Sequence, residues 1–321
     1  MKAIVYTEYG SPEVLRLEEI KKPVPKDGEV LVKVHAASVN SWDWDLVRGK
    51  PYLYRLIFGI LKPKIRIIGA DIAGEVEAAG QTVTQFKPGD HVFGDLSGGN
   101  WGGFAEYVCA REDELVLKPA SMSFEQAAAI PQAGVLALTG LRDKKQIQPG
   151  QKVLINGAGG GVGTFAIQMA KSFGAEVTGV DHTSKLDLMR SLGAVRVIDY
   201  TKEDFTQAGE RYDLVLDVTA HRSMFAYSRV LNPTGTYVMI GGSVPRIFEL
   251  LFIAPWIALT TKKRMGILAH KQNKDMAFLI ELFETGKIQP VIDRRYTLEE
   301  IPEAIRYLGE GHARGKLVIT M

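Results

Sequence analysis

The chain has 321 residues, of which 46% are hydrophobic, and 39 Lys and Arg nearly balance 37 Asp and Glu. This length predicts two domains, and the composition is that of an ordinary globular protein. Neither sign of charge gathers into a long block, which argues against a nucleic-acid partner. A small-molecule partner is expected instead.

The number of cysteines and the length of the apolar segments indicate in which cellular compartment the protein is expected. The only cysteine, Cys109, excludes an intramolecular disulfide and a cysteine-built metal site, and it favours a reducing, cytoplasmic location. The start MKAIVYTEYG is too polar for a signal peptide. The most apolar stretch, residues 247–259, is shorter than the ~20 residues that span a bilayer, so we expect no membrane partner. We interpret it as a buried helix or a lid over a pocket.

The first third of the chain alternates short apolar runs with turn clusters such as PKDG, KPGD and SGGNWGG, which predicts an all-β module of antiparallel strands. A helical pattern begins near Phe124, and from Gln151 strands and helices alternate. This alternation predicts a parallel sheet with helices on both faces. Its strands are expected at 153–156, 176–180, 195–199, 213–218, 236–241 and 264–269.

The tail after Ala269 predicts a helix over 275–285, a strand near Val291, a helix over 299–308 and the terminal strand LVIT. We assign this tail to the N-terminal module because its strand content is similar. The predicted domains are therefore 1–122, completed by 270–321, and 123–269.

A glycine-rich turn, GAGGGVG at 157–163, follows the strand expected at 153–156 and precedes an amphipathic helix. A pyrophosphate needs backbone N–H donors at a helix N-terminus with no side chain between, which Gly160 and Gly161 permit, while Gly163 lets the helix pack on the strand. Ala158 departs from the strict GxGxxG form, and a flexible turn is the alternative interpretation. Asp181, at the end of the next strand, favours a dinucleotide site.

Taken together, these segments resemble the medium-chain dehydrogenase/reductase superfamily, in its zinc-free quinone oxidoreductase-like branch. The resemblance covers nearly the whole chain and rests on GSPEVLRLEEI, GEVLVKVHAASVNSWDWDLVRGK, GADIAGEVEAAGQTVTQFKPGDHVFG, AGGGVG and HARGKLVIT. It implies an α/β protein, with a GroES-like, mainly β catalytic domain built from both chain ends and a Rossmann domain, a doubly wound parallel sheet, between them. The active site is expected in the cleft, and relatives are commonly homodimers.

The resemblance also locates the metal ligands of zinc-dependent relatives, at the positions of Asn40, Ala70 and Ala133. None of these replaces a thiolate or an imidazole, so we expect zinc independence. The histidines show no paired ligand spacing; they are His35, His91, His182, His221, His270 and His312.

Without a metal, the substrate oxygen must be polarised by hydrogen bonds, which suits an electrophilic acceptor such as a quinone or an enone. The resemblance implies that Asn40 is a donor at the cleft floor, with loop hydrogen bonding as the alternative. Asp43 is expected to orient that loop, and Tyr52 to act as a donor or as part of a lid. No general base is identifiable, so water is the expected proton source.

Cofactor contacts are expected from Ala158, Gly160, Gly161, Val162, Gly163, Asp181, His182, Lys185, Tyr200, Gly241 and Gly242. Asp181 favours NAD, since a carboxylate at this strand end accepts hydrogen bonds from both ribose hydroxyls. Lys185 resembles the phosphate-binding lysine of NADPH-dependent quinone reductases, provided that Asp181 turns aside into solvent. We favour NADPH, with NAD as the alternative. If Lys185 only begins the exposed face of the next helix, this argument fails.

The sequence therefore predicts an NAD(P)H-dependent oxidoreductase that reduces quinones, enones or related carbonyl compounds by hydride transfer. A redox-sensing or structural nucleotide-binding module without turnover is one alternative. A zinc-free alcohol dehydrogenase is another, although unactivated alcohols usually need a metal or a base.

Overall fold

The computed structural model describes residues 1–143 and 146–321, and these divide into two compact units. Unit 1 comprises residues 1–132, 272–281 and 292–321. Unit 2 comprises residues 133–271 and 282–291.

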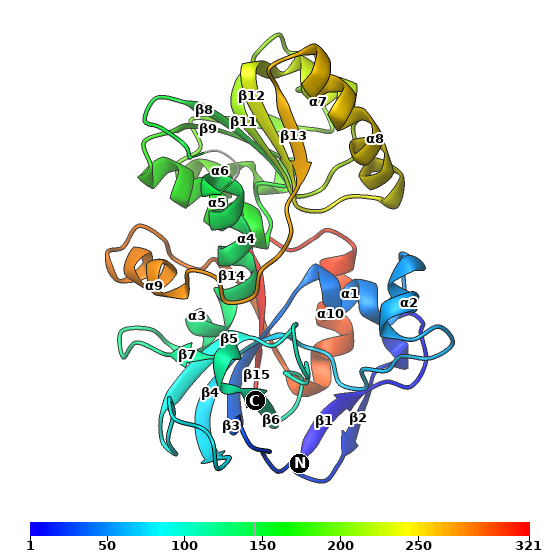
Figure 1. Ribbon diagram of the computed structural model, residues 1–321, viewed down its shortest axis with the longest axis vertical. Helices are drawn as coiled ribbons and strands as arrows, with labels where there is room; N and C mark the ends of the chain where they lie inside the picture. The colour runs from blue at the N-terminus through cyan, green and yellow to red at the C-terminus, as the bar shows by residue number, and fades with distance from the viewer. Residues whose placement is uncertain (144–145) are drawn as a thin grey trace. The chain divides into compact units, whose positions relative to one another are not determined.

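Unit 1 is mainly β structure. Its strands are β1 (Lys2–Val5), β2 (Arg16–Glu19), β3 (Glu29–Val39), β4 (Asp71–Ala79), β5 (His91–Asp95), β6 (Tyr107–Arg111), β7 (Val116–Leu117), β14 (Ile292–Thr297) and β15 (Lys316–Thr320). Its helices are α1 (Ser41–Arg48), α2 (Leu53–Phe58), α3 (Phe124–Ala129), α10 (Ile301–Gly309) and the first part of α9 (Met276–Glu284). In the larger sheet the order is β14-β15-β3-β4-β5-β7, with β6 also paired to β3 (Figure 1).

Strand β3 lies in the middle of this sheet, and most of its residues are buried on both faces. It pairs antiparallel with β4, β6 and β15, so the C-terminal strand lies directly beside the end of β3. Helix α10 packs its buried residues Ile301, Ala304 and Ile305, at helical spacing, into the same core. This pairing brings residues from both ends of the chain together where β3 ends.

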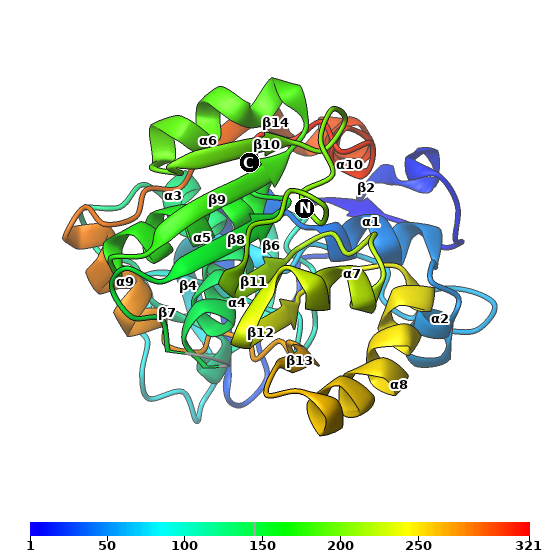
Figure 2. The same ribbon diagram turned by 90° about the horizontal axis from the view of Figure 1, so that it is seen from above.

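Unit 2 is a parallel sheet flanked by helices. Its strands are β8 (Lys152–Asn156), β9 (Glu176–Asp181), β10 (Arg196–Asp199), β11 (Tyr212–Asp217), β12 (Leu231–Met239) and β13 (Arg264–Ile267). Its helices are α4 (Pro131–Arg142, from Ala133 on), α5 (Gly161–Ser172), α6 (Leu186–Leu192), α7 (Met224–Arg229) and α8 (Val244–Thr260). The order β10-β9-β8-β11-β12-β13 is that of a doubly wound Rossmann sheet, and Figure 2 shows α6 by β10 and α8 by β13.

The structure confirms the predicted α/β class and all six predicted parallel strands. Two expectations were wrong. The first third is not purely β, because α1 and α2 interrupt it after β3. The interpretation of residues 247–259 as a buried helix was also wrong, because only Leu250 and Ile257 of α8 are buried, while the alternative of a lid over a pocket stays a prediction. Among the described residues, no helix combines the length and apolarity needed to cross a bilayer.

Candidate functional site

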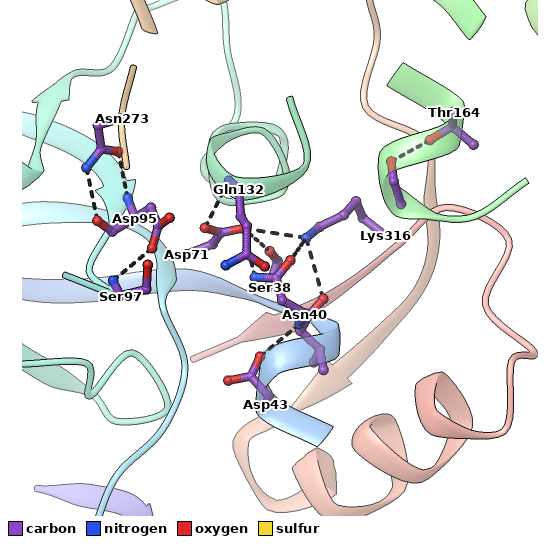
Figure 3. Close-up of polar contacts among 12 residues, drawn as sticks. Ser38, Asn40, Asp43, Asp71, Asp95, Ser97, Gln132, Thr164, Asn273 and Lys316 are labelled. Carbon is purple, nitrogen blue, oxygen red and sulfur yellow. Dashed lines mark hydrogen bonds and ion pairs between the residues drawn. The ribbon is translucent and has the colours of Figure 1, made fainter. Parts of the chain in front are cut away.

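A buried polar cluster lies where β3 ends, and it contains the predicted donor Asn40 (Figure 3). Asn40 Nδ2 donates to Asp71 Oδ2 over 3.0 Å, at the start of β4. Lys316 Nζ, at the start of β15, donates to Asn40 Oδ1 over 2.5 Å and lies 3.5 Å from Asp71 Oδ2. The strand pairing thus brings the Asn40 amide, the Asp71 carboxylate and the Lys316 ammonium into hydrogen-bond contact.

Asp71 is the centre of this cluster and is fully buried. Besides Asn40 and Lys316, it accepts hydrogen bonds from Ser38 Oγ at 3.2 Å and from the Gln132 backbone N–H at 3.2 Å. Burial raises the pKa of the Asp71 carboxyl, and the Lys316 charge opposes that shift. Burial likewise lowers the pKa of Lys316, which is 3% exposed, and the facing carboxylates oppose it. Each of these two buried groups is therefore kept in its charged form by the charge of the other.

These contacts fix the orientation of the Asn40 amide. An ammonium only donates and a carboxylate only accepts, so Oδ1 must face Lys316 and Nδ2 must face Asp71. A primary amide nitrogen carries two hydrogens, and Asp71 takes one of them. The second N–H has a fixed direction, and Asn40 is 7% exposed. The arrangement can present one pre-oriented hydrogen-bond donor to a substrate oxygen.

Asp43 supports this position from α1. One carboxylate oxygen accepts from the Asn40 backbone N–H at 2.8 Å, and the other accepts from the Gly69 backbone N–H at 3.1 Å. The side chain is fully buried, and burial raises its pKa to about 7. Its contacts are those of a residue that holds the two loops together. Tyr52 is placed differently, because it is 66% exposed and has the Arg55 guanidinium 5.0 Å from its ring centre.

The residues at the expected metal-ligand positions do not fit zinc. Ala70 and Ala133 carry no donor atom, and the Asn40 amide oxygen is occupied by the Lys316 ammonium. Within residues 1–143 and 146–321, no group of three His, Cys, Asp or Glu side chains is placed to hold a metal ion. A cation is already provided at this position by a lysine.

In unit 2, the glycine-rich turn connects β8 to α5. The first N–H groups of an α-helix have no acceptor within the helix, and no side chain caps them here, where Gly160 is the N-cap. A Cβ on Gly160 would approach nothing closer than 3.5 Å, so the space beside these donors is open. A Cβ on Gly163 would lie 2.3 Å from the Gly157 carbonyl oxygen, so close packing requires glycine there. The turn fits a pyrophosphate on its N–H groups.

Asp181 and Lys185 are paired beside this turn. Asp181 Oδ2 accepts from the Gly159 backbone N–H at 2.8 Å, and Lys185 Nζ lies 3.5 Å from Asp181 Oδ1. Asp181 is 6% exposed and Lys185 is 7% exposed. The Asp181 carboxylate does not face solvent in this structure, because it is bound by the turn itself. The alternative that Lys185 begins an exposed helix face is wrong.

The remaining predicted adenosine residues gather at the same strand end. The rings of His182 and Tyr200 lie 6.2 Å apart, and Tyr200 is half exposed. His182 Nδ1 lies 3.1 Å from the Ser184 hydroxyl oxygen. The Thr183 hydroxyl donates to Asp199, whose pKa lies well below its usual range because of this bond and that from Thr201. Hydroxyl, imidazole and aromatic groups thus surround the end of β9.

Gly241 and Gly242 follow β12, where the chain contacts the residues after β11. A Cβ on Gly241 would lie 2.7 Å from the Val218 carbonyl oxygen, so this approach requires glycine. Beneath them, the buried Asp217 accepts from Asn156 Nδ2 and from the Tyr237 hydroxyl, both at 2.8 Å. This network holds the ends of β8, β11 and β12 together.

Sequence reasoning missed Asp71, Lys316 and the Asp217 network. Two weak signals were present. Asp71 directly follows Ala70, one of the predicted ligand positions, and Lys316 begins the otherwise apolar run LVIT. Their contact could not be foreseen, because it depends on the register that pairs β15 with β3 and β3 with β4.

Comparisons with known proteins match both parts of the chain. The alcohol dehydrogenase GroES-like domain family matches residues 26–120, and the zinc-binding dehydrogenase family matches residues 192–319. The second match includes none of the three positions where zinc-dependent relatives have their ligands.

Relatives that match nearly the whole of this chain are oxidoreductases of the same kind. The chain is 34% identical to a chloroplastic quinone oxidoreductase of Triphysaria versicolor over 99% of this chain and 98% of the relative. It is 34% identical to an NADPH-dependent alkenal/one oxidoreductase of Arabidopsis thaliana over 99% of this chain and 79% of the relative. The crystal structure of Escherichia coli quinone oxidoreductase complexed with NADPH superimposes with a TM-score of 0.87 at 25% identity, covering all of both chains.

Proposed function

This chain belongs to the medium-chain dehydrogenase/reductase superfamily, in its quinone oxidoreductase-like branch, and we propose that it reduces quinones or α,β-unsaturated carbonyl compounds with NADPH, without zinc. The observation that carries the proposal is the Asn40–Asp71–Lys316 cluster. It replaces a metal centre by a lysine cation and a pre-oriented amide donor. Such a donor polarises a carbonyl oxygen but does not generate an alkoxide from an unactivated alcohol.

The chemistry follows from what the residues can hold. NADPH, when bound at the glycine-rich turn and Asp181–Lys185, supplies a hydride. The second Nδ2–H of Asn40 would donate to the acceptor oxygen and stabilise the negative charge that this oxygen gains on reduction. The Lys316 ammonium, bound to the other end of the amide, favours that charge. Water supplies the proton that completes the enol or the hydroquinone.

Cofactor choice is proposed from unit 2 and from the NADPH-dependent relatives. Lys185 is held 3.5 Å from Asp181, and His182, Thr183 and Ser184 provide further donors beside it. A lysine can neutralise a 2′-phosphate as a point charge. We place Tyr200 beside the adenosine and Gly241 and Gly242 beside the nicotinamide.

The test is NADPH consumption by the purified protein with a panel of quinones, enones and simple alcohols or ketones. We expect turnover with quinones or enones, faster with NADPH than with NADH. Tight cofactor binding with no turnover on any acceptor would favour a redox-sensing module. Faster turnover of unactivated ketones and alcohols would instead favour an alcohol dehydrogenase.

Three further expectations belong to this proposal. Residues 1–122 with 270–321 act as the catalytic domain, and residues 123–269 as the dinucleotide domain. The protein forms a homodimer, which light scattering after size-exclusion chromatography would measure. It acts in the cytoplasm, which the single cysteine favours and which cell fractionation would check.

A further inference from the structure

Helix α8 has an exposed face that is entirely apolar. Leu250 and Ile257 anchor the opposite face in the unit 2 core, with Ile247, Ile253 and Ala254 partly buried beside them. The outward face follows the spacing i, i+3, i+4, i+7 and consists of Phe248, Leu251, Phe252, Pro255, Trp256 and Leu259. Phe252 is 75% exposed and Leu259 is 86% exposed. Helices that are apolar on all sides are normally covered.

The apolar face continues onto α7. The ring of Phe225, which is 45% exposed, lies 5.8 Å from that of Trp256 in an edge-to-face contact. We call this surface, the six outward residues of α8 together with Phe225, the α8 face. Contiguous exposed apolar surface of this kind marks an interaction site.

The charge around the α8 face is strongly positive. The segment after Glu249, residues 250–274, contains five Lys and Arg and no Asp or Glu, and three of the five, Lys262, Lys263 and Arg264, follow the end of α8. Glu249 is paired with Arg246 and accepts a hydrogen bond from the Met224 backbone N–H, so these two charges cancel within α8 and leave the basic residues that follow the helix unopposed by an acid in α8. Lys262 and Arg264 line an open hollow of about 800 Å³, whose other charged residues, Arg142 and Asp143, are paired with each other at 3.3 Å.

Together, the apolar and basic features identify the partner. We propose that the α8 face binds the surface of an anionic phospholipid bilayer, with Phe252 and Trp256 inserted at the acyl boundary and Lys262 and Arg264 at the headgroups. A helix with aromatic and aliphatic residues beside basic ones has this affinity. A two-fold contact between copies through the same face would bring the two basic segments together, which charge repulsion disfavours. The sequence-based expectation of no membrane partner considered only spanning segments.

The test compares sedimentation of the full-length protein with phosphatidylcholine vesicles and with phosphatidylcholine vesicles that contain phosphatidylglycerol. We expect binding only to the anionic vesicles, weakening as salt is raised. Phe252→Ser with Trp256→Ser should lower the affinity by at least about tenfold. Lys262→Glu with Arg264→Glu should lower it about fivefold for each charge removed.

Matched controls come from unit 2. Val195→Ser removes a lone exposed apolar side chain, and Lys287→Glu reverses an exposed charge away from α8, so both should bind like the wild type. Circular dichroism melts verify that each variant is folded. Brominated acyl chains should quench tryptophan fluorescence in the wild type, and this quenching should be lost in Trp256→Phe, which tests insertion even if the serine variant does not fold.

Three outcomes would overturn the proposal. One is no binding to anionic vesicles, and another is equal binding to neutral ones. The third is a wild-type dimer that becomes monomeric in Phe252→Ser with Trp256→Ser without any vesicle binding, which would make the α8 face a subunit interface. None of these measurements depends on catalysis, so the outcome is independent of the proposed reductase activity.

Discussion

At the scale of single residues, the geometry around Asn40 separates a donor from the groups that orient it. Asn40→Ala removes the N–H that we propose donates to the acceptor oxygen, and we expect kcat to fall about 10²-fold with a smaller change in KM. Steady-state kinetics with NADPH and a reactive quinone measure this. An unchanged kcat would return Asn40 to a role in loop hydrogen bonding.

Lys316 and Asp71 are positioning residues in this scheme, and their removal as a pair leaves no buried charge without a partner. Lys316→Met with Asp71→Asn should therefore lower kcat in the wild-type background but add little to Asn40→Ala. Equal further losses in both backgrounds would show that the pair does not act through Asn40.

Asp43 makes the stability of the fold depend on pH. Its pKa is raised by burial from 3.8 to about 7, so the folded state holds this proton more tightly than the unfolded chain. Its contribution to the free energy of unfolding is complete below about pH 4 and is lost as pH rises through 7. Urea unfolding of wild type and Asp43→Asn between these values should show a flatter pH dependence for the variant. Parallel curves would assign the pH dependence to other groups.

What the sequence could reveal at this scale was the identity of residues but not their partners. Asn40 and Asp43 were found because the resemblance places them in the stretch around a ligand position of zinc-dependent relatives. Lys316 was not, because it is 276 residues away and reaches Asn40 only through the β3–β15 register. The fate of Asp181 was also beyond pattern reasoning, since it depends on a hydrogen bond to the Gly159 backbone N–H.

At the scale of elements, the turn between β8 and α5 distinguishes two glycines. Gly163→Ala places a methyl group 2.3 Å from a backbone oxygen and should lower the melting temperature. Gly160→Ala meets no close atom and leaves the N-cap in an ordinary extended conformation, so the fold should be unaffected. Its methyl group nevertheless occupies the space open to a pyrophosphate, and NADPH affinity should fall. Melting curves and cofactor titrations of both variants distinguish the two roles; loss of stability in both would contradict them.

Elements of the parallel sheet were predictable because each is a short apolar run ended by turn residues, and β8 to β13 appear where expected. Helices α1 and α2 were not predicted. Helix α1 has only eight residues and its first five are all Ser, Trp or Asp, so its helical pattern is weak, and its start is set by the Asp43 cap. Of the two interpretations of α8, the buried helix was wrong because apolar composition was taken to mean burial.

At the scale of the whole molecule, the lysine-based cluster predicts an enzyme that does not need a metal. Activity should survive dialysis against a chelator, and elemental analysis should find far less than stoichiometric zinc. The Asn40–Lys316 contact is the reason for this expectation, since the ammonium occupies the amide oxygen that a metal would need. Stoichiometric zinc, together with activity lost to chelation and restored by zinc, would contradict this.

The ion pair between Lys185 and Asp181 has a consequence for cofactor exchange. The Asp181 carboxylate lies 3.5 Å from the Lys185 ammonium, so we expect it to compete with a bound phosphate for that charge, and phosphate binding to require an open conformation in which the pair is separated. The apparent dissociation constant equals the intrinsic one divided by the open fraction. Salt therefore acts twice, weakening the attraction between Lys185 and the phosphate while loosening the pair that competes with it. The affinity for NADPH should accordingly vary less with ionic strength than the charge of the cofactor alone implies.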